Sequence, residues 1–337
     1  MSAGVKAAHE PDSVPRVAVI VPTRNRASTL PTLLEALERQ DLGRESFEVI
    51  VVDNSSTDGT AALMQDWQTK ATLSLRYFVK DNRGPAASRN YGAARARGEV
   101  LAFTDSDCIP RPTWLSSGVQ SLDDGAGIVC GPITVQEPSF LDQQIGAATR
   151  DDGLYPTANL IVRRAAFEAV GGFDERLGIY AWGGVVGGED TDLAWRLKRT
   201  GARAVFNIRT EVHHQALPLS LGQWMLRPML YRSIPMLVRR IPELRETLLW
   251  HRYFGGKDHF FFHVAWLGVA AAALTRQWLL IMFAVPWAWM VFHLVWPRVR
   301  RGRIDLAGAV FLLTLYRYFA LSVALLMGSV TARRLVL

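Results

Sequence analysis

Residues 16–215 alternate short apolar runs with amphipathic stretches, and this alternation constrains the fold more than any other feature. Apolar runs of about four to eight residues are typical of strands that are buried on both faces of a sheet. The expected strands are 16–21, 47–52, 73–79, 99–104, 127–131 and 202–208, and the expected helices begin near Ser28 and cover 59–68, 85–97 and 112–122. Strands joined by right-handed helical crossovers form a parallel sheet covered on both faces, so the sequence predicts an α/β domain.

Polar clusters follow three of these strands, at 22–26, 53–58 and 105–107. The carboxyl ends of parallel strands meet at one edge of the sheet, where α/β proteins bind their ligands. Asp105 and Asp107 stand one residue apart and could hold a divalent cation, whereas the alternative is a surface turn with the intervening serine. Three clusters at one edge favour the binding site.

Four motifs carry a recognisable pattern. They are Val-Ala-Val-Ile-Val-Pro-Thr-Arg-Asn-Arg (17–26), Val-Val-Asp-Asn-Ser-Ser-Thr-Asp-Gly-Thr (51–60), Asn82-Arg83-Gly84-Pro85 with Arg89-Asn90, and Asp105-Ser106-Asp107. In order and spacing they resemble the inverting glycosyltransferases of family 2. The resemblance covers about residues 16–215 and implies a GT-A (Rossmann-like) nucleotide-sugar-binding domain with a mostly parallel central sheet. It also implies a nucleotide-diphosphate sugar as donor and Mg²⁺ or Mn²⁺ as cofactor.

Five residues of these motifs are expected on the donor nucleotide. Asp53, at a strand end, is placed to accept hydrogen bonds from a base or ribose, while Thr23 and Arg24 could close the other side of the nucleoside. Turn chemistry is the alternative role for Asp53. Pro22 and Asn82 complete the donor side of the resemblance.

Charged groups near the diphosphate form a second set. Arg89 could neutralise the diphosphate, or it could be a solvated helix arginine. Asp107 is expected to contact the metal directly and Asp105 to contact the ribose or a metal-bound water. Of the pair His213-His214, His213 is named as a metal ligand, because neutral imidazole can ligate divalent cations; ordinary loop chemistry is the alternative.

An acidic helix is expected to begin within 187–197. At about 100° per residue, Asp190 shares a face with Leu193 and Leu197, whereas Asp192 points elsewhere. The resemblance makes Asp190 the general base that deprotonates the acceptor hydroxyl for in-line attack. Alternatively, the acids of this first turn only complement the helix dipole.

Two irregular stretches are expected to face the acceptor. Residues 134–154 are poorly patterned, and the glycine-rich segment 178–188 carries Tyr180 and Trp182, which could stack on a sugar face. Glu189, directly after that segment, completes the acceptor loop. A flexible loop without a contact role is the alternative.

The formal net charge of +7 is concentrated around apolar segments in the C-terminal third. The anion that these arginines face is therefore expected to be a lipid headgroup and not a nucleic acid. Cys108 and Cys130 are expected as reduced core thiols, although the sequence leaves a disulfide open. Residues 1–15 are expected to be disordered and lack the apolar core of a signal peptide, which places the N-terminal domain in the cytoplasm.

The remaining chain is expected at the membrane. Residues 216–257 predict short basic amphipathic helices on the bilayer face, with a solvated helical subdomain as the alternative. Within 258–337, the runs 259–275 and 278–296 predict a transmembrane hairpin at the plasma membrane. The run 304–330 contains Arg317 and is expected either to span or to lie at the interface, giving two to three membrane helices.

The resulting hypothesis is a membrane-anchored enzyme that moves one hexosyl or deoxyhexosyl group, with inversion, to a lipid-linked acceptor or a growing cell-surface glycan. Processive enzymes of this family carry Gln-x-x-Arg-Trp, which Gln223-Trp-Met-Leu-Arg227 does not match, so single transfer is favoured. A nucleotidyltransferase is the first alternative, but 22–28 lacks the glycines of a phosphate loop. A non-catalytic membrane scaffold is the second.

Overall fold

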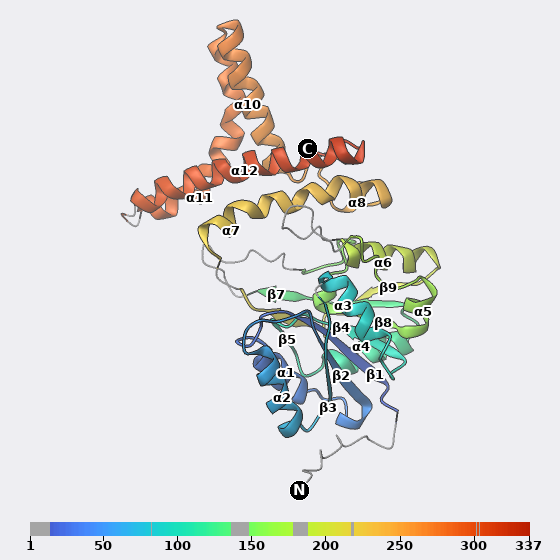
Figure 1. The fold of residues 1–337 in the computed structure, drawn as a ribbon. Coiled ribbons are helices and arrows are strands. Elements are labelled where there is room, and N and C mark those ends of the chain that lie inside the picture. The colour runs from blue at the N-terminus through green and yellow to red at the C-terminus, as the bar shows by residue number, and fades with distance from the viewer. Residues whose placement is uncertain are drawn as a thin grey trace. The chain divides into compact units, whose positions relative to one another are not determined.

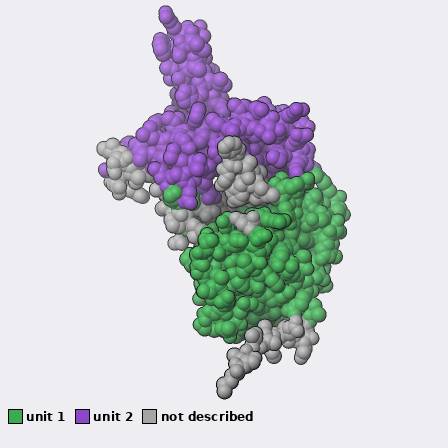
Figure 2. All heavy atoms as spheres, in the orientation of Figure 1, with its two compact units in different colours: residues 1–220 green, residues 221–337 purple. Residues whose placement is uncertain are grey.

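The computed structural model describes residues 14–81, 83–135, 148–177, 188–216, 219–300, 302 and 304–337. The chain divides into two compact units, residues 1–220 and 221–337 (Figure 2), close to the division expected after residue 215. The expected disordered lead-in falls almost entirely outside the described residues.

The first unit is built on a mixed sheet that has seven strands among the described residues, in the order β3-β2-β1-β4-β8-β6-β9 (Figure 1). The strands are β1 Val17–Thr23, β2 Phe47–Asp53, β3 Ser74–Val79, β4 Val100–Phe103, β6 Ile128–Cys130, β8 Leu160–Arg163 and β9 Ala204–Phe206. Neighbouring strands are parallel except where β8 pairs with β4 and β6. The prediction of an α/β domain with a mostly parallel sheet is confirmed, although β8 was not expected as a strand.

Helices cover both faces of this sheet (Figure 1). They are α1 Leu30–Glu38, α2 Thr60–Lys70, α3 Gly84–Ala93, α4 Trp114–Asp123, α5 Arg164–Ala169 and α6 Glu189–Arg199, with the short 3₁₀ turns η1 Arg44–Ser46 and η2 Thr157–Asn159. Apolar side chains of α1, α2 and α4 form one core with the sheet, and those of α3, α5 and α6 form the other. The alternating faces of the buried strands supply both cores.

Two helix boundaries differ from expectation. Ser28 is exposed and does not cap α1, which instead begins after Thr29 without a side-chain cap, because the Arg26 carbonyl accepts the first N–H groups of this turn. Helix α3 ends at Ala93 and not at 97, since the chain turns back toward β4 there. Gly98 allows that turn: a Cβ at this position would lie 2.7 Å from the backbone carbon of Val17.

A second, smaller sheet lies beside the end of β4. Its strands are β5 Cys108–Pro110, β10 Val212–His214 and β7 Ile133–Val135, in the order β5-β10-β7. The histidine pair, expected on a connector, therefore sits in a strand that is antiparallel to β5, with His214 opposite Cys108. Three-residue strands are too short to show an alternating pattern, which is why the sequence did not reveal them.

The second unit is helical. Its elements are α7 Leu221–Leu226, η3 Arg227–Ser233, α8 Ile234–Arg240, α9 Leu244–Thr247, α10 Lys257–Thr275, η4 Trp278–Ala284, α11 Val285–Arg300 and α12 Ile304–Ala332. Short helices were expected before residue 257, and Pro228 and Pro235 stand in the first turns of η3 and α8, where proline fits a helix start. The long helix α12 packs on η3 so closely that Gly328 leaves no room for a side chain against the Arg232 carbonyl.

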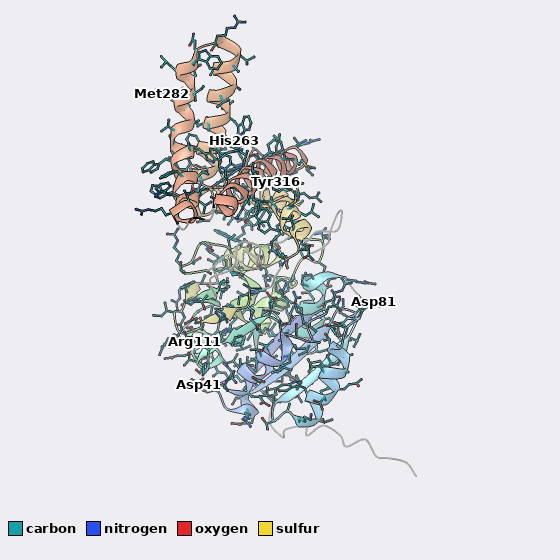
Figure 3. The ribbon with its side chains drawn as sticks, turned by 90° about the vertical axis from the view of Figure 1, so that its left-hand side faces the viewer. Asp41, Asp81, Arg111, His263, Met282 and Tyr316 are labelled. Atoms are coloured by element: carbon teal, nitrogen blue, oxygen red, sulfur yellow. The ribbon has the colours of Figure 1, made fainter. Side chains whose placement is uncertain are left out.

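Helix α10 and the segment after it form a hairpin that reverses at Arg276, whose φ is 59° (Figure 1). Gly268 permits the close approach, because a Cβ there would lie 2.7 Å from the Leu280 carbonyl oxygen. Large apolar side chains such as Met282 point outward from the hairpin (Figure 3), and Met282 is 67% exposed. The predicted reversal between the first two apolar runs is thus present.

By length and composition, Trp278–Pro297 and Ala307–Ala332 are long and apolar enough to cross a membrane. Helix α10, the expected first arm of the transmembrane hairpin, is not among these candidates. Any eighteen-residue stretch of α10 includes Asp258 together with His259 and His263, which lowers its hydropathy. The expectation that 259–275 spans a membrane therefore stays a prediction, whereas the third run, 304–330, overlaps a candidate span.

Candidate active site

The three polar clusters meet at one edge of the sheet, as expected for parallel strands. Strand β1 lies between β2 and β4, and Thr23 is the register partner of Asp53. The Asn54 amide donates to the Thr23 carbonyl at 2.8 Å, and the Thr104 amide donates to the Ile20 carbonyl at 3.3 Å. These backbone bonds tie the ends of the three strands together.

Asp53 is 1% exposed, and its carboxylate organises the loop that follows β2. It accepts hydrogen bonds from the Ser56 amide at 2.8 Å, the Ser56 hydroxyl at 2.6 Å and the Tyr77 hydroxyl at 2.5 Å. Burial and the Asp53 charge raise the pKa of Tyr77, which keeps that hydroxyl a donor. The turn role named as the alternative for Asp53 is therefore present. The nucleotide-binding role of Asp53 stays a prediction.

The other donor-side residues differ in exposure. Pro22 and Thr23 are buried, whereas Arg24 is exposed. The buried Thr23 hydroxyl finds no hydrogen-bond partner among the described residues. A buried hydroxyl without a protein partner needs an explanation, and hydrogen bonding to a ligand is one that fits its place beside Asp53. Asn82 lies outside the described residues.

Arg89 is buried on α3 and joins two acidic residues. Its guanidinium lies 2.7 Å from Asp105 Oδ1 and 3.1 Å from Glu189 Oε1. Burial alone would lower the pKa of Arg89, but Asp105 and Glu189 more than offset that effect and the pKa is raised. The solvated-arginine alternative is wrong. Arg89 instead links Asp105, two residues after the end of β4, to Glu189 at the start of α6.

Glu189 was expected in an acceptor loop, but the structure places it as the first residue of α6, 6% exposed. One carboxylate oxygen pairs with Arg89, and the other is buried without a partner among the described residues. Because α6 begins at Glu189, directly after Gly188, the Glu189 side chain is buried and is not part of an exposed loop. Tyr180 and Trp182, the other members of that loop, lie outside the described residues, as does most of 134–154.

A group of potential metal ligands lies at the end of the small sheet where β5 begins and β10 ends. It consists of Asp107, Cys108 and His214, all buried, whose ligand atoms lie within 4.8 Å of one another. Asp107 Oδ1 is 3.5 Å from His214 Nε2, and Asp107 Oδ2 is 3.5 Å from Arg26 Nη2. Burial raises the pKa of Asp107, His214 opposes this, and Asp105 adds to it. We call these three residues the cation cluster.

His214 is arranged as a metal-binding imidazole. Its Nδ1 lies 3.1 Å from the Gln215 carbonyl oxygen, which can accept a hydrogen bond from it, and its Nε2 faces Asp107 Oδ1 at 3.5 Å. A ligating histidine usually donates its second N–H in this way. A carboxylate and a neutral imidazole fit a divalent cation that keeps further positions for phosphate oxygens and water.

His213 was named as the metal ligand, but the structure brings His214 to Asp107 instead. Successive residues of a strand face opposite sides, and His213 Nδ1 lies 3.4 Å from the Thr134 hydroxyl. Sequence reasoning also missed Arg26 and Cys108. Both had a visible signal, since Arg26 ends the first polar cluster and Cys108 follows Asp107 directly.

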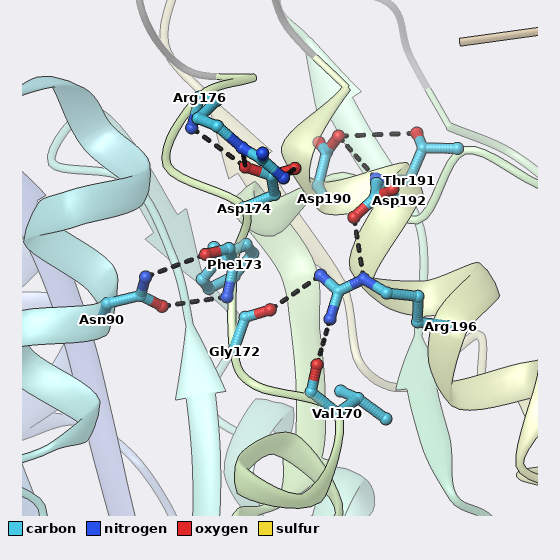
Figure 4. Close-up of polar contacts among 10 residues, drawn as sticks. All are labelled: Asn90, Val170, Gly172, Phe173, Asp174, Arg176, Asp190, Thr191, Asp192 and Arg196. Atoms are coloured by element: carbon cyan, nitrogen blue, oxygen red, sulfur yellow. Dashed lines mark hydrogen bonds and ion pairs between the residues drawn. The ribbon is translucent and has the colours of Figure 1, made fainter. Parts of the chain in front are cut away.

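Asp190 lies in the first turn of α6, after Gly188 with a φ of 115°. Its Oδ1 accepts the Thr191 amide at 2.7 Å (Figure 4), while the Thr191 hydroxyl donates to the Leu154 carbonyl at 2.6 Å. Burial and the neighbouring Glu189 charge raise the pKa of Asp190 to about 7, against the opposing effect of the Thr191 amide. A carboxylate with a pKa near neutrality is suited to take a proton.

Asp192 has a different task, in line with the expectation that it points elsewhere. It accepts a charge-assisted bond from Arg196 Nε at 2.8 Å, and the same guanidinium donates to the carbonyls of Val170 and Gly172 at 2.6 and 2.7 Å (Figure 4). These bonds fasten α6 to the segment after α5. The helix-dipole alternative alone does not explain these two different arrangements.

Comparisons with known proteins agree with this geometry. The family described as "Glycosyl transferase family 2" matches residues 18–165. "Glycosyltransferase AglE" of Haloferax volcanii is 32% identical over 56% of this chain and 63% of its own length. "Pre-mycofactocin glycosyltransferase" of Mycobacterium tuberculosis is 30% identical over 66% of this chain and 48% of its own length. The chain thus covers between about half and just under two thirds of the length of these two relatives.

A solved structure, the mannosyltransferase PcManGT from Pyrobaculum calidifontis in complex with GDP-Man and Mn²⁺, aligns with 98% of this chain and 90% of its own, with a TM-score of 0.58 and 20% identity. At that identity the likeness concerns the fold alone. Sheet order, strand-end clusters and comparisons agree on the GT-A fold. Residues 18–165 of this chain therefore form a domain of glycosyl transferase family 2.

Proposed function

We propose that this protein transfers one sugar from a nucleotide-diphosphate sugar to an acceptor hydroxyl, with inversion at the anomeric carbon. The observation that carries the proposal is Asp190, a carboxylate whose pKa is raised to about 7 at the start of a helix tied by Arg89 to the carboxyl end of β4. The family and the complex of PcManGT with GDP-Man support the donor class.

Asp107 and His214 are proposed to hold the cation, Mg²⁺ or Mn²⁺, because their oxygen and nitrogen atoms already lie 3.5 Å apart. The cation, when bound, neutralises charge on the leaving diphosphate. Arg26, 3.5 Å from Asp107, supplies a second positive charge at the same place. Asp105, held by Arg89, is left to contact the ribose or a metal-bound water.

Asp190 is proposed to remove the proton from the acceptor hydroxyl as that oxygen attacks the anomeric carbon. Direct attack by the acceptor exchanges the two faces of that carbon once, which gives inversion. Covalent catalysis by Cys108 is not favoured, because burial and the charges of Asp105 and Asp107 raise its thiol pKa well above the usual value. A protonated, buried thiol is a poor nucleophile.

The test is Asp190→Asn, with Asp174→Asn as a matched control. Asp174 is a nearby acid held by Arg176 Nε at 2.9 Å (Figure 4), and it has no proposed part in proton transfer. Loss of a general base should lower kcat by about 10²–10⁴-fold in the first variant and leave the second near wild type. Turnover is measured as nucleotide release with a panel of nucleotide sugars, and NMR gives the anomeric configuration of the product. Equal rates in Asp190→Asn and wild type would refute the base assignment.

We further propose that the second unit anchors the protein at the plasma membrane, with the catalytic domain in the cytoplasm and a lipid-linked or cell-surface glycan as acceptor. The two apolar candidate helices and the basic residues of 221–257 support this. Residues 216–257 would lie at the interface. The test is extraction: the protein should stay with membranes in high salt and alkaline carbonate and leave them only in detergent.

A further inference from the structure

The cation cluster contains the sulfur atom of Cys108. Sugar transfer assisted by Mg²⁺ or Mn²⁺ does not require a sulfur ligand. Cys108 is fully buried, faces His214 across the β5–β10 pair, and has its Sγ within 4.8 Å of the ligand atoms of both Asp107 and His214. Mg²⁺ prefers oxygen ligands, whereas a thiolate beside an imidazole is a donor set that Zn²⁺ and other thiophilic cations prefer. The chemistry of this cluster therefore goes beyond that of a simple magnesium site.

One of the three ligand separations already matches that of a tetrahedral ion, and the sulfur lies within 4.8 Å of the other two ligand atoms. Zinc bonds are about 2.3 Å to sulfur and about 2.0–2.2 Å to nitrogen and oxygen, so two ligand atoms on one ion are roughly 3.3–3.6 Å apart. Asp107 Oδ1 and His214 Nε2 already meet this separation at 3.5 Å. The backbone N–H of Gln215 donates to the backbone carbonyl of Asp107 at 2.9 Å, so the two chain segments that carry the ligands are held together.

We propose that Cys108 Sγ, Asp107 and His214 form a tetrahedral site that selects Zn²⁺ and Cd²⁺ over Mg²⁺ and leaves one position for water or a phosphate oxygen. On binding, a metal–sulfur bond replaces the S–H bond and the thiol proton goes to solvent. Zn²⁺ then competes with Mn²⁺ for Asp107 and His214. This inference rests on the cation site of the proposed function, but not on sugar transfer itself.

The direct experiment is a Cd²⁺ titration of the purified full chain in detergent, followed by the ultraviolet absorbance of the cadmium–thiolate bond. Wild type should develop the band with one equivalent of Cd²⁺. Cys108→Ser should not, and Cys130→Ser is the matched control that should behave like wild type. Cys130 is the other free cysteine, buried in β6 outside the cluster. A band that persists in Cys108→Ser, or none in wild type, overturns the proposal.

Metal selectivity gives a second readout. Bound Mn²⁺ is detected by electron paramagnetic resonance, and Zn²⁺ should displace it from wild type. Loss of an outer-shell partner already weakens metal binding by about 10–100-fold, so removal of the sulfur ligand should weaken Zn²⁺ binding by at least about 100-fold. The Zn²⁺/Mn²⁺ preference should fall by a similar factor. An unchanged preference in Cys108→Ser contradicts the inference.

A third measurement needs no variant, in case a substitution at this buried position prevents folding. X-ray absorption at the zinc edge of the wild-type protein should show one sulfur at about 2.3 Å together with nitrogen and oxygen ligands. A shell of nitrogen and oxygen alone would overturn the proposal while leaving sugar transfer untouched. Conversely, sulfur ligation in a chain that transfers no sugar would defeat the proposed function and not this inference.

Discussion

Two carboxylates at the same sheet edge are equally buried and yet differently arranged. Asp53 is 1% exposed and accepts three hydrogen bonds of 2.5–2.8 Å, from Ser56 and Tyr77. Asp107 is 5% exposed, and the nearest side-chain nitrogens of Arg26 and His214 both lie 3.5 Å from its carboxylate. A buried carboxylate that accepts three short hydrogen bonds from neighbouring side chains and backbone organises a loop, whereas one whose cationic partners lie 3.5 Å away leaves room for a metal ion. Burial alone does not distinguish the two roles, but the hydrogen bonds do.

The largest effect on stability is expected at Arg89, which links Asp105, after β4, to the first residue of α6. Arg89→Met should lower the free energy of unfolding by about 3–5 kcal/mol, because it leaves Asp105 and the buried Glu189 without their cation. Denaturant unfolding in detergent measures the change. The control is Arg163→Met, whose half-exposed pair with Asp123 spans 3.7 Å and should contribute less than about 1 kcal/mol. Equal losses in both variants would show that the buried Arg89 pairs contribute no more to stability than a half-exposed ion pair.

Asp107→Asn should separate function from stability. We expect sugar transfer and Mn²⁺ binding to fall by at least about 100-fold, since a metal ion contributes several kcal/mol to transition-state stabilisation. The free energy of unfolding should change by less than about 1 kcal/mol, because no short charge-assisted bond is lost. Isothermal titration with Mn²⁺ and an unfolding curve test both halves. A large loss of stability would mean that Asp107 stabilises the fold as Asp53 does, and would contradict the contrast drawn between them.

Asp53→Asn should do the reverse. The amide of the variant cannot accept from both of the groups that now bond to the two carboxylate oxygens, so the free energy of unfolding should fall by about 1–3 kcal/mol. Tyr77→Phe in the same background forms a double-mutant cycle. If the two losses simply add, the Tyr77 bond does not account for the effect and the comparison with Asp107 weakens.

The pH dependence of the base tests the other carboxylate assigned to the reaction. The pKa of Asp190 is raised to about 7, so the ionised form that accepts a proton is lost as pH falls through 7. The value of kcat/KM should level off above pH 7 and fall about tenfold per unit below it. The raised pKa also means that the folded state binds the proton more tightly than the unfolded chain. Asp190 therefore lowers stability as pH rises from about 4 to 7, and Asp190→Asn should remove that slope. An unshifted profile in the variant would point to another base.

The order of the main-sheet strands and their helices in 16–131, and the meeting of the three polar clusters, were determined by the sequence alone. Apolar runs that are continuous over a strand length can only be buried on both faces, and right-handed crossovers then place every strand end at one edge. The motifs from 17 to 107 carried the family resemblance for the same reason, because each lies next to one strand end. The apolar helices after 278 were equally legible, since their composition is a local property.

Only the tertiary structure decided which charged groups meet. Glu189 is one hundred positions from Arg89, and His214 is far along the chain from Asp107. The local sequence pattern around these residues therefore cannot predict either contact. The choice of His214 over His213 depends on the register of a three-residue strand, in which a shift by one residue exchanges the two faces. The same register brings Cys108 into the cation cluster. Composition and periodicity specify elements, but register and helix packing specify the chemistry that those elements bring together.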